Sequence, residues 1–455
     1  MPLRRTVLAA SVTAVACLGL SAPAHAATPI VAGGAPVTVT TTTSGQNATL
    51  TFSGTAGQRV SLVMSDVTMG GSTCCGTKVS LLRPDGTALV RPTYVGTLGG
   101  FFDTKVLPVN GIYKIFVDPQ GTVTGSMTLQ LYNVPPDVTG PIPFGGAPTQ
   151  VDLGTPGQNA RLSFSGAVGR RVSVDVGGVT LASVKVSVLR PDGTAVAAAL
   201  TINHNGGFLG PYTLPVAGTY KVFVNPVRAA TGSATLALYD VPPDVTGSIA
   251  PGGASQSVTL TTPGQNARLT FSGTVGQRVS LKLSAVTIGS STCCGAKVSI
   301  VKPDGTLLLP KLSFGTNGLF VEPLALPVTG TYKLVLDPQL AATGGATAQV
   351  YLVPADVTGS VAIGGSVTPT ISTPGQNARY TFSGTAGKAL TLTVSGFAVS
   401  TSTRITVKTP GGTIILSSFT SADKVLNVTL PVAGTYTLGF DPVGDGTGSL
   451  TLALS

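Results

Sequence analysis

Two pairs of adjacent cysteines are the residues of this sequence most able to do chemistry. They lie in matching segments, Gly-Ser-Thr-Cys-Cys-Gly and Ser-Ser-Thr-Cys-Cys-Gly. Neighbouring α-carbons are about 3.8 Å apart, less than the roughly 4.4–6.8 Å usual across a disulfide, so a bridge within one pair would be strained and readily reduced. Three interpretations stay open: a vicinal bridge that stiffens the loop, cross-links between units or molecules, and free thiols or a metal site. The possible disulfides or loop sites are Cys74, Cys75, Cys293 and Cys294.

Catalysis is not expected, because no set of acid, base and nucleophile is evident. His204 is the one histidine outside the N-terminal segment that holds His25, and a serine or cysteine nucleophile needs a base held beside it. Aspartates recur at turns or between units, which is typical of turn-forming side chains. We therefore predict a non-enzyme with no catalytic residues; an enzyme with an unfamiliar site is the least favoured hypothesis. The recurring aspartates are Asp85, Asp192, Asp304, Asp118, Asp337, Asp441, Asp137, Asp244 and Asp356.

Metal binding has weak support. Aspartates could hold calcium together with backbone carbonyls, and two local pairs exist, Asp441 with Asp445 and Asp240 with Asp244. Such pairs are also typical of charged turns. We predict no metal site and no cofactor.

A segment that occurs four times organises the chain. Its best example, Thr261–Leu281, reads TTPGQNARLTFSGTVGQRVSL, and its glycines recur at Gly45, Gly157, Gly264 and Gly375, spacings of 112, 107 and 111 residues. These spacings exceed a solenoid unit and match a small domain. Within the segment, apolar residues alternate with polar ones on both sides of the turn at 273–276, which predicts a β-hairpin and the folding core of each unit.

Other motifs repeat in the same order in every unit. Pro-Asp-Gly, replaced by Pro-Gly-Gly in the fourth unit, predicts a tight turn, and Leu-Pro-Val-x-Gly-x-Tyr precedes a late strand. Three Val-Pro-Pro/Ala-Asp-Val-Thr-Gly segments, 134–140, 241–247 and 353–359, are predicted to be short, stiff linkers. The fold class predicted is all-β, with four tandem antiparallel β-sandwich (jelly-roll-like) domains after a signal peptide. They would form a rod of about 150 Å or fold back on themselves.

The predicted boundaries follow from the repeats. Residues 1–26 are predicted to be a signal peptide, since Arg4 and Arg5 precede an apolar run and Ala24-His25-Ala26 precedes Ala27. A lipoprotein signal at Cys17 is the alternative and is disfavoured by the alanine three positions before it. The four sandwich repeats are predicted at 27–138, 139–245, 246–357 and 358–455. We therefore expect a secreted, extracellular protein.

The net charge of the chain limits the classes of partner that we expect. Without Arg4 and Arg5, 25 basic residues face 17 acidic ones, a net charge of +8, and only 10% of residues are charged. This is too dilute for nucleic-acid binding, and no apolar run of membrane length exists. Basic residues recur at matching strand positions, where they could meet anionic polymers; the favoured interpretation is that they protect strand edges from aggregation. The three sets are Arg161, Arg268 and Arg379; Arg59, Arg171 and Arg278; and Lys78, Lys185 and Lys297.

The order of the motifs resembles bacterial pre-peptidase C-terminal (PPC) domains. The shared features are Gly-Gln before a strand, Phe-x-Gly-x-x-Gly before another, Pro-Asp-Gly, and Gly-Thr-Tyr before a late strand. The resemblance implies a secreted jelly roll, often attached to exported enzymes. We expect a secreted non-catalytic repeat protein that serves as a cell-surface, matrix or extracellular binding module, with envelope polysaccharide or an extracellular protein as partner. The alternative is an accessory or inhibitor-like partner of an exported enzyme. The oligomeric state is left open.

Overall fold

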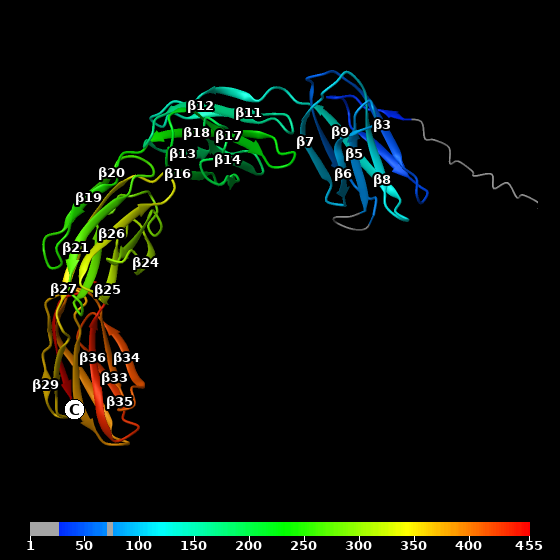
Figure 1. Cartoon of the computed structure of the whole chain (residues 1–455). Coiled ribbons are helices and arrows are strands. Elements are labelled where there is room, and N and C mark those ends of the chain that lie inside the picture. The colour runs from blue at the N-terminus through cyan, green and yellow to red at the C-terminus, as the bar shows by residue number, and fades with distance from the viewer. Residues whose placement is uncertain (1–26, 71–75) are drawn as a thin grey trace, which may run out of the picture.

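The described chain is built from β-strands alone. In the computed structural model, residues 27–70 and 76–455 are described, and they form 37 strands in eight sheets and no helix. The strands are grouped into four repeats that follow one another along a curved array, from the blue N-terminal repeat to the red C-terminal one (Figure 1). We define repeat 1 as β1–β9, repeat 2 as β10–β18, repeat 3 as β19–β27 and repeat 4 as β28–β37.

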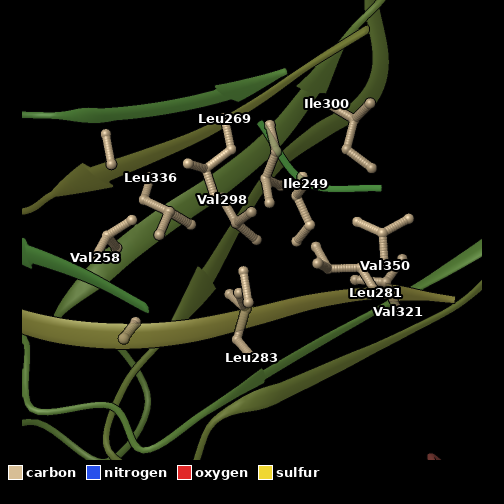
Figure 2. Close-up of a cluster of buried hydrophobic side chains, with 14 of the residues drawn as sticks. Ile249, Val258, Leu269, Leu281, Leu283, Val298, Ile300, Val321, Leu336 and Val350 are labelled. Atoms are coloured by element: carbon tan, nitrogen blue, oxygen red, sulfur yellow. The ribbon is translucent and has the colours of Figure 1, made fainter. Parts of the chain in front are cut away.

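Repeat 3 shows the arrangement of strands. Its two sheets enclose a core of buried aliphatic side chains that includes Leu269, Leu281 and Val298 (Figure 2). The five-stranded sheet has the order β19 (Val245–Ser248), β21 (Ala267–Gly273), β26 (Gly330–Pro338), β23 (Ala296–Val301) and β24 (Leu307–Phe314). The four-stranded sheet has the order β20 (Gln256–Leu260), β27 (Gly344–Val353), β22 (Arg278–Ser284) and β25 (Leu319–Ala325).

The other repeats follow the same order. In repeat 1, the first sheet has the order β1 (Thr28–Pro29), β3 (Ala48–Gly54), β8 (Gly111–Pro119), β5 (Thr77–Leu82) and β6 (Ala88–Val95). Its second sheet has the order β2 (Val37–Thr41), β9 (Gly125–Asn133), β4 (Arg59–Ser65) and β7 (Gly100–Val106). In repeat 2, the first sheet has the order β10 (Val138–Pro141), β12 (Ala160–Gly166), β17 (Gly218–Pro226), β14 (Val184–Leu189) and β15 (Leu200–Ile202). Its second sheet has the order β11 (Thr149–Leu153), β18 (Gly232–Asp240), β13 (Arg171–Gly177) and β16 (Gly207–Thr213). In repeat 4, the first sheet has the order β28 (Val357–Ser360), β31 (Ala378–Gly384), β36 (Gly434–Pro442), β33 (Thr403–Lys408) and β34 (Ile414–Thr420). In its second sheet, β29 (Ser366–Val367) and β30 (Thr370–Ile371) both pair with β37 (Gly448–Leu454), which is followed by β32 (Ala389–Val399) and β35 (Lys424–Thr429).

The prediction of four tandem antiparallel β-sandwich domains of jelly-roll type is wrong beyond the all-β class. One sheet of each repeat is mixed, because its first strand pairs in parallel: β1 with β3, β10 with β12, β19 with β21, and β28 with β31. The segments predicted as linkers supply three of these strands. The repeats therefore form one continuous array in which each contacts its sequence neighbours, as in solenoid proteins, rather than independent domains on spacers. The predicted boundaries of the repeats stay a prediction.

The predicted hairpin within the repeated segment is also wrong. In repeat 3, β21 pairs with β19 and β26, whereas β22 pairs with β25 and β27 in the facing sheet. The turn at 273–276 thus carries the chain from one sheet to the other. The alternation correctly identified the apolar residues that face the core, since Leu269, Phe271, Val279 and Leu281 are all buried, although Ser280 between the last two is buried as well. Period-two alternation identifies the buried face and does not identify the pairing partner.

The motifs around the late strand anchor each core. Tyr332 is fully buried, its hydroxyl donates to the carbonyl of Val328 at 2.6 Å, and its ring stacks on Phe271 with centroids 5.3 Å apart. The other three repeats hold the same arrangement at Tyr113, Tyr220 and Tyr436. The aspartate of the Pro-Asp-Gly turn accepts from the backbone N–H two residues later, as Asp304 does from Thr306 at 2.9 Å. The turn role predicted for this aspartate is confirmed.

Candidate functional site

The connections between repeats are fixed to both neighbours. We call residues 134–137, 241–244 and 353–356 the connectors, and the contact that each makes between two repeats a junction. In the first connector, the N–H of Val134 donates to the carbonyl of Arg59 in repeat 1, and just past its end the N–H of Val138 donates to Asn159 in repeat 2, both at 2.8 Å. Val241 and Val245 repeat this pattern around the second connector. The expected spacers are thus ordered parts of the junctions.

An aspartate at the end of each connector bridges two arginines from different repeats. Asp244 accepts from Nη2 of Arg171 in repeat 2 at 2.9 Å and from Nε of Arg268 in repeat 3 at 2.6 Å. Asp137 joins Arg59 at 2.5 Å to Arg161 at 2.8 Å, and Asp356 joins Arg278 at 2.9 Å to Arg379 at 3.3 Å. The favoured interpretation of these arginines, protection of strand edges, is therefore wrong. They are structural partners of the connector carboxylates.

The pKa is lowered for two of the bridging carboxylates, those of Asp137 and Asp244. Burial raises the pKa of the Asp244 carboxyl, but the hydrogen bonds and charges of Arg268 and Arg171 outweigh burial, so the pKa is lowered. The pKa of Asp137 is lowered in the same way by Arg161 and Arg59. Both carboxylates stay ionised near neutral pH, and their ion pairs hold the junctions together there.

The repeated Thr-Pro-Gly-Gln segment is a junction motif as well as part of each repeat. At the second junction, Ser173 donates from Oγ to the carbonyl of Pro263 at 2.7 Å, and Gln265 donates from Nε2 to the carbonyl of Pro243 at 2.9 Å. Gly264 has φ +89°, and a Cβ there would lie 3.3 Å from Ser173 and from Phe208. A side chain at this position would strain the backbone and crowd the preceding repeat. The serine–proline bond recurs at Ser61 with Pro156 and Ser280 with Pro374.

Repeats 1 and 4 each lack a bridging arginine on the side where no other repeat of this chain lies. Repeat 1 has Thr49 at the position of Arg161, and Gly45 has no atom within 4 Å of a Cβ built on it. Repeat 4 has Ala389 at the position of Arg278. The arginines therefore occur at the faces that meet another repeat of this chain. The signal in the sequence is the absence of arginine at Thr49 and Ala389, the two positions where the recurring arginines are interrupted.

A cleft lies at the junction of repeats 1 and 2. It has a volume of about 380 Å³, and repeat 1 lines it with residues that include Tyr94, Phe101 and Asp103. Repeat 2 contributes Lys185, Asn225–Arg228 and no carboxylate. Its size falls within the range of about 300–1,000 Å³ typical of ligand sites. The cleft is a candidate binding site formed by two repeats.

Lys185 lacks the cross-strand carboxylate that the matching basic residues of the other three repeats have. On the neighbouring strand, Lys78 lies opposite Asp118, Lys297 opposite Asp337 and Arg404 opposite Asp441. In repeat 2 the residue opposite Lys185 is Asn225. Since asparagine carries no charge, Lys185 has no carboxylate at the cross-strand position where an opposite charge would attract it.

The predicted cysteine sites are described for one pair. Cys293 and Cys294 form a vicinal disulfide in an exposed loop, and Ser291 accepts from both of their backbone N–H groups at 3.3 and 3.1 Å. This agrees with the first of the three interpretations for this pair. Cys74 and Cys75 lie outside the described residues. A functional role for the four cysteines stays a prediction.

The other residues considered for chemistry do not come together. His204 is exposed in the turn between β15 and β16, and Asp240 pairs with Arg170 at 2.7 Å. Asp445 forms an ion pair with Lys282 of repeat 3. Within residues 27–70 and 76–455, no group of three or more histidine, cysteine, aspartate or glutamate residues could hold a metal ion, and no helix is long and apolar enough to cross a bilayer.

No protein-family model and no curated protein matches the chain. Among solved structures, it is similar to the pre-peptidase C-terminal domain of collagenase from Bacillus anthracis at 11% identity and a TM-score of 0.19, over 22% of this chain and 98% of that one. It is also similar to the CUB1-EGF-CUB2 domains of human MASP-1/3, at 10% identity and a TM-score of 0.16 over 45% and 100% of the two chains. A third similarity is to an M60 catalytic domain with two CBM51 domains from Clostridium perfringens, at 9% identity and a TM-score of 0.18 over 88% and 55%. At these scores the similarities carry no argument about fold or function, so the PPC resemblance stays at the level of the sequence motifs.

Proposed function

We propose that this chain is a secreted, non-catalytic repeat protein that acts as an extracellular binding module on a cell surface or matrix. The observation that carries the proposal is the triple use of one junction, in which a connector aspartate bridges arginines of two repeats. Such a junction links neighbouring repeats of the curved array (Figure 1) and brings surfaces of two repeats side by side. A fixed surface loses less conformational freedom on binding than a flexible chain.

The test is retention of purified residues 27–455 on isolated cell envelopes, on envelope polysaccharides and on the exported proteins of the producing cell. Retention on envelopes or polysaccharides is expected. Retention on a single exported enzyme, with a change in its activity, would favour the accessory or inhibitor role instead. Lack of retention on every surface would count against a binding module.

Secretion is tested separately. Export with cleavage after Ala26 predicts that Ala27 is the first residue of the protein recovered from the medium. N-terminal sequencing of that protein measures it. Recovery of the chain only inside the cell, with residues 1–26 attached, would contradict this part of the proposal.

A further inference from the structure

We propose that the cleft between repeats 1 and 2 binds an anionic saccharide segment, with Lys185 and Arg228 pairing with its carboxylate or phosphate groups. The inference rests on the proposed binding function and names the ligand class. It is carried by the juxtaposition, in one cleft, of two cations without an ion-pair partner and an exposed aromatic ring.

The charges of the cleft favour an anion. Neither Lys185 nor Arg228 takes part in any salt bridge or hydrogen bond of its side chain within the described residues. The one carboxylate that lines the cleft belongs to Asp103, whose Oδ1 accepts from the N–H of Thr104 at 2.7 Å. Two positive groups thus face one negative group. An anionic ligand would gain two charge-assisted contacts there.

Arg228 is particular to repeat 2. Its backbone has φ +58°, and the matching positions are Leu340 at φ +55° in repeat 3 and Gly121 and Gly444 at φ +65° and +63°. The left-handed conformation therefore belongs to the turn in all four repeats, and the guanidinium is what repeat 2 adds. Glycine adopts this conformation without strain, so Arg228→Gly removes the cation and keeps the turn.

The aromatic wall suits a sugar ring. Tyr94 is 52% exposed, and the Nζ of Lys78 lies 4.9 Å from its ring centroid. Tyrosine offers an apolar face together with a polar hydroxyl, which matches the mixed surface of a saccharide. A small inorganic anion would not use that face. The combination of cations and ring is the reason for assigning an anionic saccharide.

The experiment measures binding to the full mature chain by isothermal titration calorimetry at low salt. The probes are an oligogalacturonate hexamer for carboxylate, a glycerol-phosphate oligomer for phosphate and maltohexaose as the neutral control. The variants are Asn225→Asp, which restores the carboxylate found opposite the basic residue in the other repeats, and Arg228→Gly. Leu340→Gly is the matched control at the same turn of repeat 3.

We expect one or both anionic probes to bind more tightly than maltohexaose. Each variant should weaken binding about fivefold, the effect of one well-placed exposed ion pair, and added salt should weaken it further. Leu340→Gly should bind like the wild type. No binding of either anionic probe at about 1 mM, or equal binding by wild type and both variants, would overturn the proposal. Retention on envelopes without anion binding would leave the proposed function standing and reject the cleft as its site.

Discussion

Replacing Asp244 by asparagine tests whether the connector aspartates hold the array together. The substitution keeps the shape of the side chain and removes the charge that Arg171 and Arg268 share. The side chain of Asp244 is 12% exposed, that of Arg171 is 23% exposed and that of Arg268 is 47% exposed. The contact to Arg171 is therefore largely shielded from water, whereas the contact to Arg268 is close to a surface ion pair.

The expected loss of stability follows from these exposures. A charge-assisted hydrogen bond contributes about 1.5–3 kcal/mol when shielded, and an exposed ion pair contributes about 0.2–1 kcal/mol. The low ends of these ranges sum to about 2 kcal/mol, and the asparagine oxygen recovers part of that. We expect a loss of about 1.5 kcal/mol. If two repeats of roughly 200 residues unfold together, this lowers Tm by about 3–6 °C.

Two measurements on the full mature chain check this expectation. Differential scanning calorimetry should show a lower Tm and a broader transition, because neighbouring repeats are coupled less strongly. Small-angle X-ray scattering should show a more flexible array. Asp304→Asn is the matched control, since Asp304 lies in an exposed turn and bonds Thr306 of the same repeat; it should change stability by less than about 0.5 kcal/mol. Equal stability and equal scattering for the two variants would refute the structural role of the bridge.

Three further predictions concern the junctions and the cysteine loop. Gly264→Ala should cost about 1 kcal/mol more than Gly45→Ala in thermal unfolding, because both have positive φ but only the first would crowd a neighbouring repeat; equal losses would contradict the close approach. The pKa of Asp137 is lowered in the folded chain, so its contribution to stability is present above about pH 4 and is lost as pH falls through the folded value. Denaturant unfolding from pH 7 to pH 3 should therefore show a fall that begins near pH 4, and a rise in that range would contradict it. Reduction should add about 2 Da to the intact mass for a bridge between Cys293 and Cys294, whereas a dimer that separates on reduction would indicate cross-links between molecules.

The sequence predicted local structure better than the connections between strands. Alternation correctly identified buried residues such as Leu269 and Val279, and Pro-Asp-Gly correctly located the turns. The pairing of β21 and β22 was wrong because two strands of facing sheets bury the same alternating pattern as a hairpin. The short parallel strands were missed because a four-residue segment such as Val-Thr-Gly-Ser carries almost no periodicity.

The candidate site was not predicted, for a different physical reason. Each arginine or aspartate of a bridge is a weak signal of function by itself, because its partner belongs to an adjacent repeat. Asp244 resembles a linker aspartate until Arg171 and Arg268 are seen on both sides of it. Likewise, Asn225 is informative only because the other repeats carry aspartate there and because it faces Lys185. The recurrence of the arginines and aspartates was evident from the sequence, but their pairing was not, because it depends on which faces of adjacent repeats meet.

The missing arginines at the two outer faces bear on how copies of this protein meet. The contacts between repeats are head to tail, and a head-to-tail contact that does not close on itself can extend into a filament. Two chains placed end to end would bring Ala389 of one toward Thr49 of the other, so neither arginine of the bridge would be present. The arginine–aspartate bridge that joins repeats within the chain is thus not reproduced between chains placed in this way.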